Sequence, residues 1–211
     1  MQGKLECVAQ INLLDSNGHM QYDKLKNCNK VKVSETYLKG CYVIEPKIFE
    51  DERGFFFESY NKKIFEEYIG QIIDFVQDNH SVSNKGVLRG LHFQKGRHSQ
   101  AKLVRVVQGE ALDVVVDLRK DSPTYGNHFK VRLSGESNRL VFIPKGMAHG
   151  FLALKNDTIF TYKCDEYYHK ASEAGIIFND KDLKIDWEFP IEDLILSEKD
   201  KNLPEIKDLD L

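Results

Sequence analysis

The sequence predicts an all-β sandwich or barrel with a few short helices. Short apolar or alternating runs recur through its centre, at 103–107, 111–118, 129–133, 140–143, 151–154 and 158–162. Turn-forming residues separate several of these runs, namely Ser134-Gly135, Pro144-Lys145-Gly146 and Asn156-Asp157. Many short strands at this spacing, with one early helix, are typical of an all-β sandwich or barrel.

The remaining elements follow from local signals. Cys41–Ile44 is a strand-like run that ends at Pro46. Asn61 is a suitable cap for a short helix through residues 62–69, which Gly70 would end. Near the end of the chain, Ser197 followed by Glu-Lys-Asp predicts the capped first turn of a small helix.

Composition limits the classes of protein that the chain can belong to. Its 211 residues suit one domain, and a net charge of −3 argues against a general nucleic-acid binder. No signal peptide and no run of about 18 apolar residues is visible, so we expect a cytoplasmic protein without a membrane partner. The cysteines form no CxxC pair or zinc spacing and are read as reduced thiols; they are Cys7, Cys28, Cys41 and Cys164.

The chain divides at about residue 37. Residues 1–36 are polar and weakly patterned, apart from the run Gln10–Leu14, which could form half of a hairpin. We treat them as an N-terminal extension of unknown role and residues 37–211 as a single domain.

Two segments of the centre carry groups suited to chemistry. The first, Gly86–Gln94, contains Arg89 and His92. Residues three apart on a strand face opposite ways unless a bulge intervenes, and Gly90 would accommodate one. A lone histidine in a strand is more often structural, so this segment alone does not establish a catalytic base.

In the second segment, Pro144 and Gly146 precede His149 at the start of a strand. This PxGxxH pattern resembles the second motif of the cupin superfamily, which implies a closed two-sheet jelly roll. In metal-binding cupins that histidine joins a His-x-His pair, but here the residue two after His92 is Gln94. We therefore expect no metal, because so few facing imidazoles make a poor transition-metal site.

Four stretches in a fixed order make the resemblance specific. They are 51–59 (DERGFFFES), 77–81 (QDNHS), 86–94 (GVLRGLHFQ) and 143–151 (IPKGMAHGF). Together they resemble the dTDP-4-dehydrorhamnose 3,5-epimerase family, a metal-free branch of the cupins. The similarity extends over roughly residues 37 to 203, through 160–163 (FTYK), 177–180 (IFND) and 196–200 (LSEKD).

The resemblance implies a role for individual residues. His92 matches the family's base, Asp200 its carboxylate partner, Tyr162 the opposing acid and Lys102 the enolate-stabilising lysine. Ala101 stands where glycine is usual, which removes no functional group. The implied substrate contacts are Arg53, Glu58, Gln77, Asn79, Arg89, His149, Glu173 and Lys199.

The chemistry asks for the same residue types. A C4 ketone acidifies the hydrogens on C3 and C5, and a histidine base near neutrality can remove them. A carboxylate orients the imidazole, and a fixed cation stabilises charge on O4. Inversion also needs an acid on the opposite face, which a neutral tyrosine such as Tyr162 can supply.

These observations predict a cofactor-free epimerase that inverts C3 and C5 of dTDP-4-dehydro-6-deoxy-D-glucose to give dTDP-4-dehydro-L-rhamnose. The family resemblance also implies a homodimer with shared sites, because the strand carrying Arg53 crosses to the neighbouring subunit. The alternatives are an epimerase of one carbon, or of another nucleotide 4-keto sugar including a heptose. A sugar-nucleotide-binding cupin without catalysis and a metal-dependent cupin are less favoured.

Overall fold

The computed structural model describes residues 31–210, and most of these residues form β-strands. The strands are β1 (Lys32–Glu35), β2 (Tyr42–Glu45), β3 (Phe49–Asp51), β4 (Gly54–Phe56), β5 (Gln77–Ser83), β6 (Leu88–Gln94), β7 (Lys102–Gln108), β8 (Glu110–Asp117), β9 (His128–Ser134), β10 (Leu140–Ile143), β11 (Met147–Ala153), β12 (Thr158–Cys164) and β13 (Glu173–Gly175). The helices are α1 (Lys62–Ile69) and α2 (Glu198–Lys201), with 3-10 turns η1 (Gly96–His98), η2 (Lys170–Ser172), η3 (Ile191–Asp193) and η4 (Ile206–Asp208).

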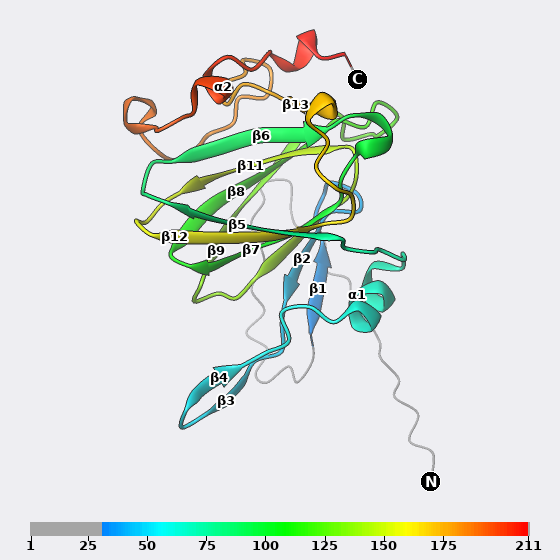
Figure 1. Ribbon diagram of the computed structural model, residues 1–211, viewed down its shortest axis with the longest axis vertical. Helices are drawn as coiled ribbons and strands as arrows, with labels where there is room; N and C mark the ends of the chain where they lie inside the picture. Colours follow the sequence, from blue (N-terminus) through cyan, green and yellow to red (C-terminus); the bar gives the residue numbers. More distant parts are fainter. Residues whose placement is uncertain (1–30, 211) are drawn as a thin grey trace.

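Two antiparallel sheets face each other (Figure 1). One has six strands in the order β1-β2-β10-β7-β12-β5, and the other has five in the order β13-β6-β11-β8-β9. This arrangement is the cupin-type jelly roll that the resemblance implied. The six central runs predicted as strands correspond to β7–β12, which confirms the predicted fold class.

The sheets bury an apolar cluster between them, because alternate residues of each strand point inward. Val104 of β7, Val115 of β8 and Phe160 of β12 are fully buried there. The rings of Phe151 and Phe160 stack across the two sheets with centroids 4.0 Å apart. This cluster fills part of the interior, and polar side chains line the rest.

Each sheet also has a covered outer face. Helix α1 packs Phe65 and Ile69 against the six-stranded sheet, where the Phe65 ring meets Phe142 edge-on at 5.3 Å. The segment after β13 covers the five-stranded sheet with Trp187 and Ile206. The C-terminal part of the chain therefore lies against β6 (Figure 1).

The signals at both ends of α1 are confirmed. The Asn61 side chain accepts a hydrogen bond from the Ile64 N–H at 3.4 Å. Gly70 has a φ of 72°, and its N–H donates to the Glu66 carbonyl. The smaller helix α2 begins as predicted after Ser197, whose hydroxyl accepts the Asp200 N–H at 3.1 Å.

The boundary of the barrel differs from the predicted one. Residues 32–35 form β1, which pairs with β2 along its whole length. The sheet therefore begins before residue 37, inside the segment assigned to the extension. The run Gln10–Leu14, with Cys7 and Cys28, lies outside the described residues. Within residues 31–210, no helix has the length and apolar character needed to cross a membrane.

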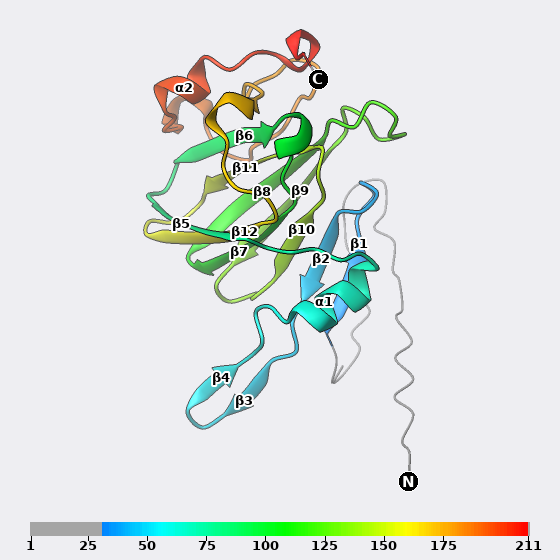
Figure 2. The same cartoon turned by 45° about the vertical axis from the view of Figure 1, so that its right-hand side comes forward.

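Strands β3 and β4 form a separate two-stranded hairpin. It projects away from the barrel on the side where α1 lies (Figure 2). Its aromatic side chains are exposed, with Phe55 at 57% and Phe56 at 66% of their full accessible surface. An isolated hairpin that exposes so much apolar surface has few contacts with its own chain to stabilise it.

Candidate active site

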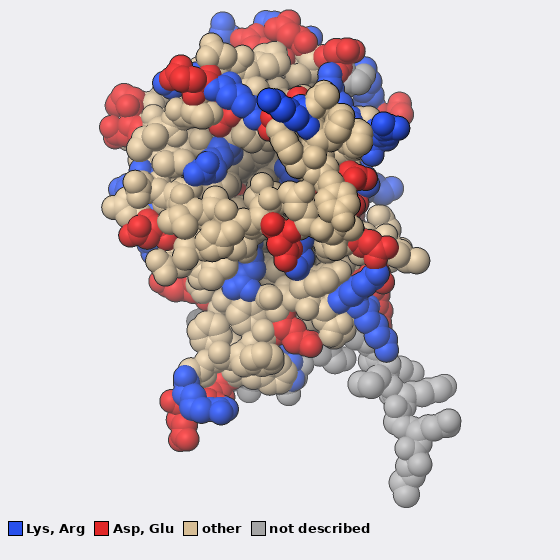
Figure 3. Space-filling model, in the orientation of Figure 1, with Lys and Arg blue, Asp and Glu red and all other residues tan. Residues whose placement is uncertain are grey.

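A polar pocket of about 680 Å³ opens between the two sheets, lined by β6 and β11 on one side and β5, β7 and β12 on the other. Figure 3 shows the surface hollowed between β6 and the β5–β12 pair, with basic side chains near the rim. The alternation of β12 that buries Phe160 also turns Tyr162 and Cys164 inward.

A bulge in β6 brings Arg89 and His92 to the same side. His92 pairs with His149 of β11, whereas Arg89 pairs with Phe151, so β6 has one residue more than its partner between these points. Gly90 lies in this bulge with a φ of 128°. The predicted bulge is therefore confirmed, and both Arg89 and His92 line the pocket.

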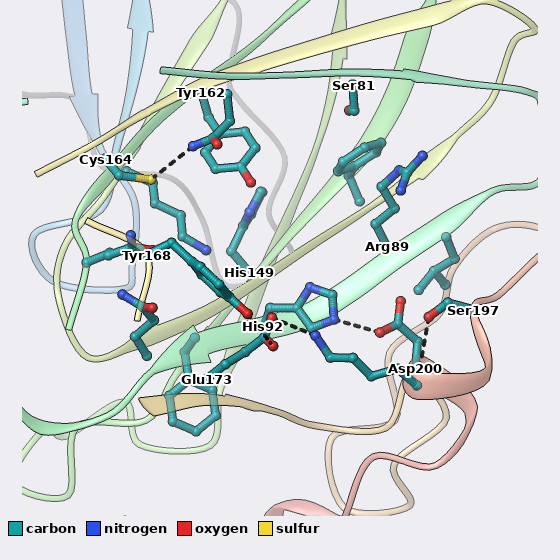
Figure 4. A pocket seen from close by; sticks show the side chains of 18 of the residues that line it. Ser81, Arg89, His92, His149, Tyr162, Cys164, Tyr168, Glu173, Ser197 and Asp200 are labelled. Atoms are coloured by element: carbon teal, nitrogen blue, oxygen red, sulfur yellow. Dashed lines mark hydrogen bonds and ion pairs between the residues drawn. The ribbon is translucent and has the colours of Figure 1, made fainter. Parts of the chain in front are cut away.

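His92 and Asp200 form a close pair, although 108 residues separate them in the sequence. Nε2 of His92 lies 2.7 Å from Oδ1 of Asp200, which is only 4% exposed (Figure 4). Burial acts to raise the pKa of Asp200, but the contacts with His92, the Gly90 N–H and Ser197 together outweigh it and the net pKa is lowered. Since an ionised carboxylate only accepts, Nε2 carries the proton and Nδ1 is free to act as a base.

Tyr162 projects its hydroxyl into the pocket from the other sheet (Figure 4). Burial raises the pKa of this phenol, so it remains protonated at neutral pH. Lys102, on the neighbouring strand β7, lies with its Nζ 5.9 Å from the centre of the Tyr162 ring. Histidine and tyrosine thus approach the cavity from opposite sheets.

Lys102 is a buried cation at the floor of the pocket. Its side chain is 8% exposed, and no group among the described residues forms a hydrogen bond or ion pair with its ammonium. Burial lowers the pKa of Lys102. An ammonium held in this way favours an approaching negative charge, because the more distant carboxylates of Asp113 and Glu173 only partly offset its burial.

The predicted substrate contacts divide into two groups. Six of them line the pocket beside the predicted catalytic residues: Gln77, Asn79, Arg89, His149, Glu173 and Lys199. The other two, Arg53 and Glu58, do not. Arg53 stands at the tip of the β3–β4 hairpin, 84% exposed, where it pairs with Asp51. Glu58 accepts a hydrogen bond from Asn61 at the start of α1.

Two interactions connect polar side chains at the rim, one between separate elements and one within β5. Lys199 of α2 pairs with Glu173 of β13 at 2.6 Å. Burial acts to raise the pKa of Glu173, but the contact with Lys199 outweighs it and the pKa is lowered. Within β5, the Gln77 side-chain amide donates a hydrogen bond to the side-chain oxygen Oδ1 of Asn79 at 2.9 Å.

Sequence reasoning missed several residues of the site. Asp113 of β8 is fully buried and lies 2.7 Å from Nε2 of His149. The missed signal was a carboxylate inside the apolar run 111–118, which burial requires to have a partner. Cys164, Tyr168 and Ser197 also line the pocket, but no local pattern distinguishes them.

Burial and Asp113 act in opposite directions on His149. Burial lowers the pKa of His149, and the Asp113 carboxylate only partly offsets this effect. His149 is therefore expected to stay neutral at physiological pH. Within residues 31–210, no group of three or more histidine, cysteine, aspartate or glutamate side chains is arranged to hold a metal ion.

A jelly roll that presents a carboxylate-oriented histidine opposite a tyrosine defines a cupin-type acid–base site. A family model described as dTDP-4-dehydrorhamnose 3,5-epimerase matches residues 35–208. The chain therefore belongs to the dTDP-4-dehydrorhamnose 3,5-epimerase family.

Individual relatives agree with this assignment. The dTDP-4-dehydrorhamnose 3,5-epimerase of Shigella flexneri is 49% identical over 180 residues, which cover 85% of this chain and 98% of that protein. The crystal structure of the Elizabethkingia anophelis enzyme of the same name has a TM-score of 0.82 at 54% identity and covers 84% of this chain and 97% of that one. A Legionella pneumophila dTDP-6-deoxy-D-glucose-3,5-epimerase in complex with dTDP-4-keto-L-rhamnose also has a TM-score of 0.82, at 48% identity, covering 85% and 95%.

Proposed function

We propose that this protein is an isomerase that inverts C3 and C5 of dTDP-4-dehydro-6-deoxy-D-glucose, giving dTDP-4-dehydro-L-rhamnose. The observation that carries this proposal is the 2.7 Å contact between His92 and Asp200, in a pocket whose other wall holds Tyr162. A base oriented by a carboxylate on one face and a proton donor on the other are what inversion next to a ketone requires.

His92 removes the proton in the first step. Its Nδ1 is the free ring nitrogen, because Asp200 fixes the proton on Nε2. When Nδ1 takes the proton from C3 or C5, the imidazolium that forms is stabilised by the Asp200 carboxylate. The electron pair of the broken C–H bond moves toward the C4 carbonyl, and an enolate results.

Lys102 and Tyr162 complete the reaction. The Lys102 ammonium stabilises the negative charge that develops on O4, since it has no partner among the described residues. Tyr162 then donates its proton to the carbon from the face opposite His92, which reverses the configuration. The buried phenol suits this role because its raised pKa keeps it protonated.

We further propose a homodimer in which the β3–β4 hairpin reaches the partner's pocket. Arg53 and Glu58 lie away from the pocket of their own chain, and the hairpin exposes Phe55 and Phe56. A second copy that buried this surface would bring a guanidinium to the diphosphate of the substrate. We place the protein in the cytoplasm, which the free thiols of Cys41 and Cys164 support.

Proton exchange followed by NMR in deuterated water tests the proposed reaction. With dTDP-4-dehydro-6-deoxy-D-glucose, the unaltered protein should exchange and invert both C3 and C5. The His92→Asn variant should do neither while keeping its fold. Exchange at only one carbon would indicate a single-carbon epimerase, and exchange only with another nucleotide sugar would change the substrate. Binding without any exchange would indicate a non-catalytic protein.

The same assay separates the acid from the base. Tyr162→Phe keeps His92 and removes only the hydroxyl that returns the proton. This variant should still exchange label at the substrate carbons while failing to invert at least one of them. Complete loss of exchange with binding intact would instead give Tyr162 a part in deprotonation. Activity should survive exhaustive chelation, and loss restored by one specific metal would contradict the cofactor-free mechanism.

A further inference from the structure

The segment that carries Asp200 is separate from both sheets and is attached to the barrel at its two ends. At the near end, the Ile195 N–H donates to the Gly86 carbonyl at 2.8 Å, and the Leu88 N–H donates to the Ile195 carbonyl at 3.0 Å. These two bonds fix the chain beside the start of β6, five residues before Asp200. Nothing in them restrains the chain beyond Asp200.

Two contacts hold the far end: the Ile177 N–H donates to the Pro204 carbonyl at 2.9 Å, and a buried carboxylate with no place in the reaction binds at Ile206. Asp180 is 3% exposed, and its Oδ2 accepts the Ile206 N–H at 2.7 Å. Its other oxygen, Oδ1, accepts the N–H groups of Asp182 and Leu183, each at 2.8 Å. Asp180 therefore joins its own turn to the chain that follows α2.

The chain between Asp200 and Ile206 also supports the strand beside His92. Leu203 packs against Gly175, where an added Cβ would lie 2.8 Å from a Leu203 methyl carbon. Gly175 pairs with His92 across β13 and β6. The tail that Asp180 holds thus touches the surroundings of both members of the pair.

We infer that Asp180 is a positioning residue for the His92–Asp200 pair, acting through its hydrogen bond to Ile206. This inference rests on the proposed function. A hydrogen bond between the imidazole and the carboxylate tolerates displacements of only a few tenths of an ångström before it weakens. Loss of this bond would leave the Ile177–Pro204 hydrogen bond as the remaining backbone attachment and would allow Asp200 to shift away from His92 while the barrel stayed folded.

The variant Asp180→Asn tests this role. An amide has one carbonyl oxygen, so its NH2 group must face either the Ile206 N–H or the N–H groups of Asp182 and Leu183, and that contact is lost. We expect kcat to fall about tenfold to a hundredfold, the effect of misplacing a catalytic group, with KM within about twofold.

The pH dependence of kcat/KM distinguishes positioning from a general loss of structure. The ionisable groups that face His92 are Asp200 of α2, Glu173 of β13 and His149 of β11. When Asp200 withdraws, the imidazolium that forms on His92 loses its closest counter-charge. The acid limb of the profile should therefore move to lower pH in Asp180→Asn, as it should in Asp200→Asn.

Asp117 provides a matched control at another part of the barrel. It is also fully buried, and its carboxylate accepts hydrogen bonds from Arg119, Ser122 and Thr124, away from the pocket lining. Asp117→Asn should lower the melting temperature without moving the acid limb. A shift equal to that of Asp180→Asn would overturn the inference.

A second variant removes the donor N–H, together with part of the buried Ile206 side chain. Ile206 is the first residue of η4, and Glu205 before it has φ −71° and ψ 157°, a conformation that a following proline accepts. Ile206→Pro should therefore produce the same loss of kcat and the same shift, even where Asp180→Asn folds poorly. Unchanged kinetics in a folded Ile206→Pro protein would overturn the inference.

Combination with Asp200→Asn completes the test. If Asp180 acts through Asp200, adding Asp180→Asn to Asp200→Asn should lower kcat/KM no further, whereas independent effects would multiply. Multiplied effects would overturn the inference. If the unaltered protein inverts neither carbon, the proposed function fails; if it inverts both and the folded Ile206→Pro protein matches it, only the inference fails.

Discussion

Among individual residues, Lys102 shows most directly how the site departs from an ordinary barrel interior. It lies in a row of inward-facing positions whose other members in β7, Val104 and Val106, are apolar and fully buried. Taking an ammonium out of water without a directly paired carboxylate costs free energy, and burial accordingly lowers the pKa of Lys102. The folded protein thus keeps a cation in the lining of the pocket at a cost in stability.

Replacing Lys102 by methionine should therefore raise stability while lowering activity. Methionine fills a similar volume without a charge, and we expect a gain of about 1 kcal/mol in the free energy of unfolding. Loss of the cation should reduce kcat about a hundredfold to a thousandfold. Chemical denaturation and exchange kinetics measure the two effects, and a destabilised Lys102→Met protein would contradict the argument.

The stability difference should also depend on pH. Because the pKa of Lys102 is lowered in the folded state, the unfolded chain binds the proton more tightly. The destabilisation caused by burying the Lys102 ammonium is fully present below the pKa that Lys102 has in the folded state. It disappears as pH rises through the ordinary lysine pKa of about 10.4. The gap between Lys102→Met and the unaltered protein should thus narrow in alkaline solution, and a constant gap would contradict this origin.

The residues that sequence analysis missed share a physical reason. His149 was identified by its turn motif, but its partner Asp113 is brought to it by pairing of β11 with β8. Asp200 illustrates the same limit, since only the family resemblance linked it to His92. A local pattern carries no information about which distant side chain completes a pair.

Of the secondary-structure elements, β6 positions the base through its bulge. Gly90 has a φ of 128°, which residues with a side chain rarely adopt. A Cβ added at Gly90 would lie 2.5 Å from the Gly150 Cα. Strands β6 and β11 contact each other here through backbone atoms alone, so no side chain can move aside to make room for a Cβ.

Gly90→Ala should lower stability by about 3 kcal/mol and abolish turnover, because β6 must separate from β11 or change register. Gly96 in η1 is a suitable control. It also has a positive φ, of 60°, but nothing lies within 4 Å of an added Cβ. Gly96→Ala should lower the free energy of unfolding by only about 1 kcal/mol, because only the backbone conformation is unfavourable for alanine. Equal effects of the two substitutions would show that the close approach is unimportant.

Secondary-structure elements could be predicted from the sequence where burial determines the pattern of apolar residues. The apolar runs of β7 to β12 and the capped helix α1 follow from residues that face a core. Strand β5 was not predicted from alternation, because the residues it turns inward line the pocket and are polar, among them Gln77, Asn79 and Ser81. A strand that lines a polar pocket therefore does not show the alternation of apolar residues by which strands are recognised in a sequence.

At the scale of the molecule, two truncated chains test which N-terminal residues folding and activity require. A chain that starts at Val31 keeps β1, and we expect it to fold and turn over like the full protein. A chain that starts at Tyr37 loses β1 and exposes the edge of β2, so it should be less stable by about 1–3 kcal/mol. Loss of activity in the folded Val31 chain would show that earlier residues contribute to the site.

Mixed dimers test the sharing of sites. Arg53→Ala and His92→Asn subunits should each be nearly inactive alone. If Arg53 serves the partner's pocket, a dimer of one of each contains one intact site and one doubly altered site. Random assembly makes half of the dimers mixed, so about a quarter of the normal activity should return on co-expression. Activity that stays at the level of the separate variants would place Arg53 outside the partner's pocket.

The long separation of His92 and Asp200 has a consequence for the order in which the protein is made. Both sheets are complete once the chain reaches Gly175 at the end of β13, whereas Asp200, the partner of His92, comes 25 residues later in the sequence. Synthesis from the N-terminus therefore produces a barrel with its histidine in place well before that histidine has a partner. The His92–Asp200 pair therefore forms only after both sheets have been synthesised.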